Sequence, residues 1–126
     1  PVIAYGQDML PAFWSATSDM PAPLRMDQAT DIAKAQQTRT AMGLKGGQLV
    51  ANPIPQEAQI PAEILKPIIE QAWQEAETQG ISAKAVTPFL LGRNFELTAG
   101  RSLTANIALV RNNARLAAQI AIAMGK

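Results

Sequence analysis

The chain has 126 residues, of which 48% are hydrophobic and 17% are charged, and its net charge is +1. This length suits one domain with a hydrophobic core, and the composition excludes disorder caused by high charge and low hydrophobicity. Eleven basic and ten acidic residues are dispersed along the chain, so no basic surface for nucleic acid is expected.

Two residue types that carry much enzyme chemistry are absent, because the chain contains no cysteine and no histidine. Disulfides and thiolate chemistry are thereby excluded, and the commonest general base and transition-metal ligand are missing. Chemistry within the chain must use carboxylates, lysines, amides or the main chain. No apolar run reaches about 18 residues, so we expect no membrane span and a soluble, cytoplasmic protein.

The start of the chain predicts a buried strand and a long loop. Residues 2–5 form a continuous apolar run, as in parallel sheets that are covered on both faces. The abrupt start of this strand suggests that sequence precedes it. Residues 7–23 carry three prolines and predict a loop in which Phe13 and Trp14 form an aromatic anchor, either by plain packing or in a functional role.

The next segment predicts a strand, a helix and a second buried strand. Residues 24–26 suit a brief strand, and Asp27 is a good N-cap for a helix over residues 28–42 that Gly43 ends. Residues 48–52 then form another apolar run. This order predicts a right-handed parallel unit.

Two helices are predicted in the following part of the chain. Residues 61–79 have apolar side chains at helical spacing, although Pro67 predicts a kink or a later start. Residues 87–98 predict a helix capped by Thr87.

The last predicted helix spans residues 102–124 and is capped by Ser102. It carries two adjacent apolar stripes, one with Leu103, Ile107 and Val110 and the other with Leu109 and Leu116. Such a broad apolar surface is expected to be buried on two sides, by the sheet and by a partner or a further segment. The predicted fold class is therefore α/β, with few parallel strands covered by helices.

Asn52 is the first candidate site residue. It follows a predicted strand, and ligands of open α/β sheets bind beyond the carboxyl ends of the strands. The alternative is a plain turn role, in which Gly46 and Gly47 lead into the strand and Asn52 and Pro53 lead out of it.

Asn106 and Asn113 are the second candidates. At about 100° per residue they lie within about 20° of each other, at the margin of the first apolar stripe. An amide there must be satisfied by neighbouring backbone or by a bound polar ligand. Asn112, Arg111 and Arg115 point away from that stripe, towards solvent or a subunit contact.

Three basic residues could bind anions. Lys84 precedes a predicted helix N-terminus and could meet a phosphate there, although an exposed lysine is the plainer interpretation. Arg93 and Arg101 flank a predicted helix and could bind anions or serve as surface residues. The glutamates of residues 61–79 form the polar face of their helix, and no phosphate-loop, dinucleotide or metal-ligand motif is found.

Several blocks, in order, resemble the pseudouridine-5'-phosphate glycosidase family, also called indigoidine synthase A-like. These blocks are Pro1–Gly6 (PVIAYG), Pro11–Phe13 (PAF), Gly46–Pro55 (GGQLVANPIP), Thr87–Leu91 (TPFLL), Glu96–Thr98 (ELT), Gly100–Leu103 (GRSL) and Asn106–Ala114 (NIALVRNNA). They cover nearly all of the chain.

The resemblance implies reversible cleavage of pseudouridine 5'-phosphate to uracil and ribose 5-phosphate, with manganese. The resemblance implies that the broken bond joins two carbons and that a lysine imine with the opened ribose supplies the electron sink. In the family, this lysine, the acidic catalytic residue and the metal-binding aspartate all lie upstream of the block matched by residues 1–6. The expected site of this chain therefore contains no catalytic residue and no metal ligand.

One site residue carries over from the family. Asn106 matches an asparagine of the family's active site and is expected to hydrogen-bond the substrate. The sequence also departs from the family pattern: Ala85 replaces a glutamate, Gly92 an alanine, Asn94 an apolar residue and Ala99 a glycine. These departures put local helix packing in doubt.

The resemblance also implies a domain organisation. Residues 1–126 would be the C-terminal segment of a single α/β glycosidase domain, a larger α/β/α sandwich whose upstream half is absent from this sequence. A homo-oligomer, for example a trimer, is expected, and the chain alone should be inactive. The alternative is a truncated, non-catalytic paralogue that acts as an oligomerisation or ligand-binding module.

Overall fold

The computed structural model describes residues 1–126 and contains three strands and four α-helices. In chain order these are β1 (Val2–Tyr5), β2 (Leu24–Met26), α1 (Ala29–Ala41), β3 (Leu49–Ala51), α2 (Ala62–Thr78), α3 (Val86–Leu97) and α4 (Arg101–Met124). Single 3₁₀ turns lie at Gln56–Ala58 and Ala83–Ala85. The predicted α/β class is confirmed, and the observed bounds agree closely with the predicted ones.

The three strands form a parallel sheet in the order β2-β1-β3. Ile3 of the central strand pairs with Leu24 on one side and with Val50 on the other. Ile3 and Ala4 are both 0% exposed, as expected for the middle strand of a parallel sheet. The helix α1 joins β2 to β3, which flank β1 and do not pair with each other.

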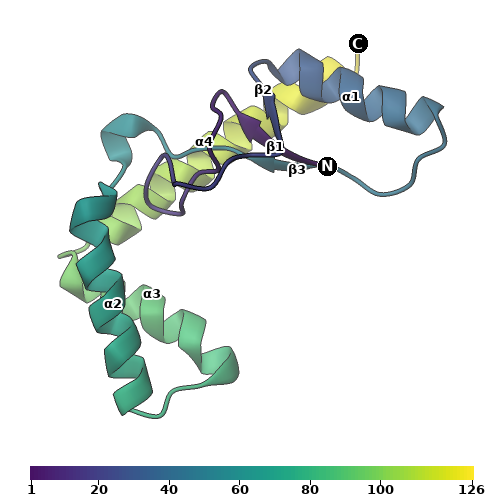
Figure 1. Ribbon diagram of the computed structural model, residues 1–126. Coiled ribbons are helices and arrows are strands. Elements are labelled where there is room, and N and C mark those ends of the chain that lie inside the picture. The colour runs from purple at the N-terminus through teal and green to yellow at the C-terminus, as the bar shows by residue number, and fades with distance from the viewer.

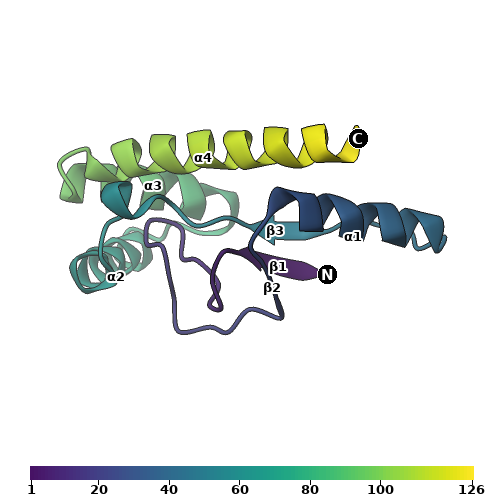
Figure 2. The same ribbon diagram turned by 90° about the horizontal axis from the view of Figure 1, so that it is seen from above.

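Helix α4 is a long helix with α2 and α3 near its N-terminal end and α1 beside its C-terminal end (Figures 1 and 2). Together α1 and α4 cover the face of the sheet that carries Val50. Strand alternation directs Leu49 to the opposite face, where it is 63% exposed. None of the helices is both long enough and apolar enough to cross a bilayer.

Only one of the two apolar stripes of α4 is buried within the chain. Leu109 and Leu116 face the rest of the molecule, at 9% and 5% exposure. Leu103, Ile107 and Val110 remain 50%, 45% and 57% exposed. The predicted burial on two sides is therefore met on one side by residues 1–126, and the other stripe is left uncovered.

The predicted caps of α1 and α3 are wrong. Gln28 is the N-cap of α1, and the Asp27 carboxylate accepts a 2.9 Å hydrogen bond from Arg25 instead of capping the helix. A charged partner outcompetes a helix amide for this carboxylate. Helix α3 begins at Val86, which leaves Thr87 inside the first turn.

The predicted starts of α4 and α2 also differ from the structure. Helix α4 follows Gly100, and Ser102 is 3% exposed within its first turn. The Ser102 N–H donates to the Thr98 hydroxyl over 3.0 Å, so the preceding segment supplies the capping oxygen. Helix α2 begins at Ala62 and continues through Pro67, which contradicts the later start.

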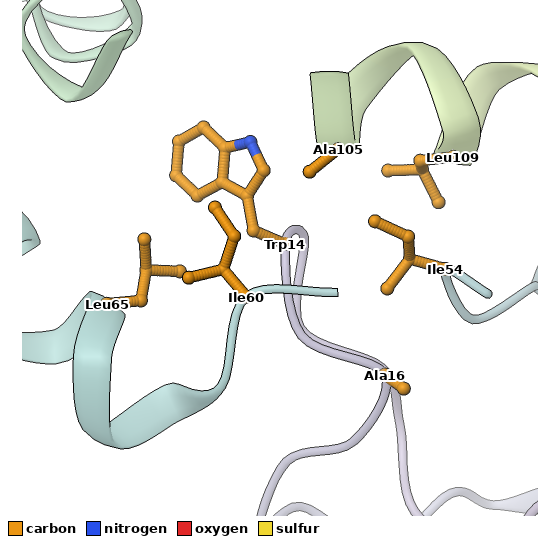
Figure 3. Packing of buried hydrophobic residues seen from close by; sticks show 7 residues of the cluster. All are labelled: Trp14, Ala16, Ile54, Ile60, Leu65, Ala105 and Leu109. Carbon is orange, nitrogen blue, oxygen red and sulfur yellow. The ribbon is translucent and has the colours of Figure 1, made fainter. Parts of the chain in front are cut away.

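Trp14 is the centre of the main hydrophobic cluster (Figure 3). Trp14 is 8% exposed and belongs to a cluster of buried residues from three segments. These include Ile60 in the loop before α2, Leu65 of α2 and Ala105 of α4. The Trp14 Nε1–H donates to the carbonyl oxygen of Ser102 over 3.1 Å. Plain packing therefore accounts for Trp14, which joins three segments of the fold.

The long loop of residues 7–23 is also tied to the segment before α2 by hydrogen bonds. The Ile60 N–H donates to the Trp14 carbonyl over 2.7 Å, and the Ser15 hydroxyl donates to the Ile60 carbonyl over 2.6 Å. The Ala16 N–H donates to the Gln59 side chain over 2.9 Å. These bonds satisfy backbone groups that a buried loop would otherwise leave unpaired.

Arg93 connects α3 to α2. Its guanidinium donates to both carboxylate oxygens of Glu75 and, over 2.7 Å, to Glu96. Hydrogen bonds from Arg93, and then from Gln71, hold the pKa of Glu75 below its usual range. The same contacts with Glu75 and Glu96 raise the pKa of Arg93.

Replacing Trp14 by Phe should lower the free energy of unfolding by about 1–3 kcal/mol, because the variant loses the bond to Ser102 and buried volume. Trp73→Phe is the matched control, since Trp73 is 46% exposed and should tolerate the change. Urea unfolding followed by circular dichroism measures both variants. Equal losses in the two variants would show that Trp14 is not an anchor.

Asn94 is 2% exposed, and its side-chain oxygen accepts no hydrogen bond from the protein. An unsatisfied buried acceptor costs about 1–3 kcal/mol, so Asn94→Leu should raise the midpoint of thermal unfolding. Gln74→Leu, at an exposed position, is the control and should leave the midpoint nearly unchanged. A lower midpoint for Asn94→Leu would indicate that the amide has a partner, such as an ordered water.

The Arg93–Glu75 contact predicts a pH-dependent stability. Because the folded pKa of Glu75 is lowered, its contribution is complete above the usual glutamate pKa of about 4.3 and is lost as the pH falls through the folded value. Melting temperatures of the wild type and of Arg93→Met should differ above about pH 5 and converge in stronger acid. Arg111→Met, at an exposed position, is the control. A difference between wild type and Arg93→Met that does not depend on pH would contradict the contact.

Candidate functional site

The carboxyl ends of β1 and β3 lie next to each other in the parallel sheet, and polar side chains gather there. β1 ends at Tyr5, and Asn52 directly follows β3. This edge of an open α/β sheet is where ligands bind, because the chain leaves the strands there and opens a crevice. Asn52 is half-buried at this edge.

Helix α4 contributes two amides to the same place. The Asn52 Nδ2 donates to the Asn113 Oδ1 over 3.2 Å, and the Asn112 Nδ2 donates to the Pro53 carbonyl over 3.0 Å. Asn112 was expected to point to solvent or to a subunit contact, and this prediction is wrong: its amide is half-buried and holds the end of β3 against α4. Asn113 is exposed.

A hollow of about 250 Å³ lies beside the Asn52–Asn113 pair. Phe13, Val50 and Leu109 form part of its wall, and no charged side chain lines it. Phe13 is 51% exposed, and its ring meets the Trp14 ring edge to face at a centroid distance of 4.8 Å. Of the predicted aromatic anchor, Trp14 is therefore buried, whereas Phe13 faces this hollow.

Asn106 lies on the same side of α4 as Asn113, about 10 Å closer to the N-terminus of the helix. It is half-buried in the wall of a mainly apolar hollow of about 380 Å³, together with Trp14, Leu91 and Leu103. Its side-chain amide makes no hydrogen bond within the chain. The Asn106 amide is therefore free to bind a ligand. The partner of Asn52 is Asn113, and Asn106 is not part of that pair.

Asn52 also lines a more polar hollow of about 330 Å³. Gln7, Gln56 and Arg115 line it, and it contains no carboxylate. Arg115 was expected to be solvated or at a subunit contact; it is exposed at this rim and forms no ion pair within the chain.

The remaining basic candidates lie away from these hollows. Lys84 is exposed in the turn before α3. Arg93 is engaged by Glu75 and Glu96, and Arg101 donates to the Gln59 carbonyl over 3.2 Å. Arg93 and Arg101 therefore have structural partners, and the anion-binding interpretation gains no support from their surroundings.

The acidic residues do not form a metal site. No three Asp or Glu side chains come together in a group that could hold an ion, and His and Cys are absent from the chain. A divalent ion such as Mn²⁺ is held by several carboxylate or imidazole ligands. The residues present therefore do not fit a manganese centre.

Comparison with known proteins gives strong similarity along nearly the whole chain. A family model described as "Indigoidine synthase A like protein" matches residues 1–123. A protein of Paracoccus denitrificans named pseudouridine-5'-phosphate glycosidase is 67% identical over 124 residues, which are 98% of this chain and 41% of the relative. A protein of the same name from Geobacillus kaustophilus is 52% identical over 96% of this chain and 40% of the relative.

Two solved structures have the same fold. An indigoidine synthase A-like protein of Thermotoga maritima aligns with a TM-score of 0.85 and 31% identity, over 100% of this chain and 41% of that protein. A prealnumycin C-glycosynthase, solved in complex with ribulose 5-phosphate, aligns with a TM-score of 0.87 and 27% identity, over 98% and 41% of the two chains. The chain spans about two fifths of the length of these relatives.

The match to the family model over residues 1–123 and the fold shared with the solved structures agree on the family of this chain. The chain belongs to the indigoidine synthase A-like family.

Proposed function

We propose that the chain is the C-terminal part of an enzyme that reversibly cleaves pseudouridine 5'-phosphate to uracil and ribose 5-phosphate. The observation that carries this proposal is the 67% identity, over 98% of the chain, with a protein named for that activity. The structural similarity to a C-glycosynthase that binds a pentulose phosphate supports the same class of chemistry. The names of both proteins refer to a sugar that is joined to its partner by a carbon–carbon bond.

The covalent step is assigned to residues outside this chain. Breaking a carbon–carbon glycosidic bond requires an electron sink, and an imine between a lysine and the opened ribose would provide one. None of the five lysines lines the hollows beside Asn106 or beside the Asn52–Asn113 pair. We therefore expect residues 1–126 to be inactive alone, and we assign the proposed manganese ligands to other residues too.

The part of the reaction proposed for this chain is substrate binding. Asn106 has an amide without a partner in the chain, in the wall of a hollow that could admit an apolar or planar group. Such an amide can donate and accept hydrogen bonds at once, which orients a substrate without adding charge. Asn106 is therefore the proposed substrate-binding residue.

A non-catalytic interaction module is the second candidate function. It is favoured by the exposed stripe of Leu103, Ile107 and Val110, because an uncovered apolar helix face is typical of a contact surface. The same stripe is compatible with a homo-oligomer, such as a trimer, of the cytoplasmic enzyme. Activity separates the two candidates, since a module would not turn over substrate.

The test of this function uses the natural polypeptide that contains residues 1–126. Incubation with pseudouridine 5'-phosphate and Mn²⁺ should release uracil, measured by chromatography. Asn106→Ala should lower the turnover by about 10- to 100-fold, the size expected for one lost hydrogen bond to a substrate. Thr104→Ala, at an exposed position on the same helix, is the control and should keep wild-type turnover.

Three results would contradict these proposals. No uracil release by the natural polypeptide would favour the interaction module. Uracil release by residues 1–126 alone would show that the covalent step lies within this chain. Wild-type turnover by Asn106→Ala, with an unchanged melting temperature, would remove Asn106 from the site.

A further inference from the structure

The Asn52–Asn113 pair leaves hydrogen-bonding groups unused. Each asparagine side chain carries one acceptor oxygen and two donor hydrogens. In the pair, the Asn52 Nδ2 donates to the Asn113 Oδ1, so the Asn52 oxygen and the Asn113 NH₂ group remain free. If both amides were rotated by 180°, the pair would still offer one acceptor and one donor. The bond places the two amides next to each other, and the pair offers one free acceptor and one free donor group.

Phe13 adds a flat apolar wall beside this edge. It lines the same hollow and is 51% exposed, although it is a large apolar residue. Its ring meets the ring of the buried Trp14 edge to face, at an interplanar angle of 88°, and this contact orients it beside the hollow. Exposed aromatic rings next to hydrogen-bonding groups suit the stacking of a planar heterocycle.

The size and charge of the hollow limit the ligand further. Its volume of about 250 Å³ lies below the roughly 300–1,000 Å³ of pockets that hold drug-sized molecules. No charged side chain lines it, so a phosphate would find no counter-charge there. The chemistry therefore suits a small, neutral and planar ring with an adjacent N–H and C=O.

We propose that Asn52 and Asn113 bind the uracil ring of the substrate through one N–H/C=O edge, while Phe13 stacks on its face. This assignment rests on the proposed function and specifies the base-binding part of the site. The Asn52 oxygen accepts from a ring N–H, and the Asn113 NH₂ group donates to the adjacent ring carbonyl. The phosphate binds elsewhere.

Equilibrium dialysis with radiolabelled uracil tests this assignment on the natural polypeptide that contains the chain. Asn113→Asp keeps the shape and the acceptor for Asn52 but replaces the free donor by an anionic oxygen, so uracil should bind about 10- to 100-fold more weakly. Phe13→Leu should weaken binding by about tenfold through lost stacking. Neither variant should change the binding of ribose 5-phosphate.

Two controls accompany this measurement. Gln119→Glu is the matched variant, since it makes the same amide-to-acid change on an exposed position of α4 that does not line this hollow. It should bind uracil as the wild type does. The competitor 1,3-dimethyluracil retains the ring but lacks both N–H donors, and it should fail to displace uracil.

The outcomes separate this inference from the proposed function. Uracil release from pseudouridine 5'-phosphate, together with wild-type uracil affinity in a folded Asn113→Asp, would overturn the base-binding assignment and leave the function standing. Asn113→Asp could weaken uracil binding while the wild-type polypeptide cleaves no pseudouridine 5'-phosphate. This result would support the base-binding assignment and overturn the proposed function. Equal displacement by 1,3-dimethyluracil would also overturn the assignment.

Discussion

The burial of Trp14 is the interaction on which the rest of this structure depends. Its indole packs against residues from the segment before α2, from α2 and from α4, and its N–H bonds to the Ser102 carbonyl in the first turn of α4. Without this contact, the loop of residues 7–23 would have little apolar area with which to offset its conformational entropy. The anchor therefore joins the end of the molecule formed by α2 and α3 to the end formed by the sheet.

The same anchor prepares the candidate site. Phe13 precedes Trp14, and because Trp14 is fixed in the core, Phe13 is held with its ring towards the hollow at the end of β3. Asn112 fixes the other wall, since its bond to the Pro53 carbonyl holds α4 against the chain that leaves the strand. Two structural contacts thus position an exposed ring and an amide pair at the candidate site.

The surroundings of these residues suit recognition more than bond making. The hollows beside Asn106 and beside the Asn52–Asn113 pair contain no lysine and no group of metal ligands. Amides and aromatic rings can orient a neutral ring without a large desolvation cost. The uncovered stripe of Leu103, Ile107 and Val110 shows that α4 has a second face available for contact.

The sequence by itself determined the secondary-structure elements, because apolar periodicity, turn glycines and prolines are local signals. Strand β1, the four helices and the positive-φ turn at Gly43 follow from these signals. It also placed Asn106 and Asn113 on one side of α4. The tertiary structure alone decided that Thr98 satisfies the start of α4, that Asn112 is structural and that Asn52 meets Asn113. Asn52 and Asn113 are far apart in the chain, so no local pattern encodes their contact. Their meeting follows from the packing of α4 against the sheet, which is a long-range property of the fold.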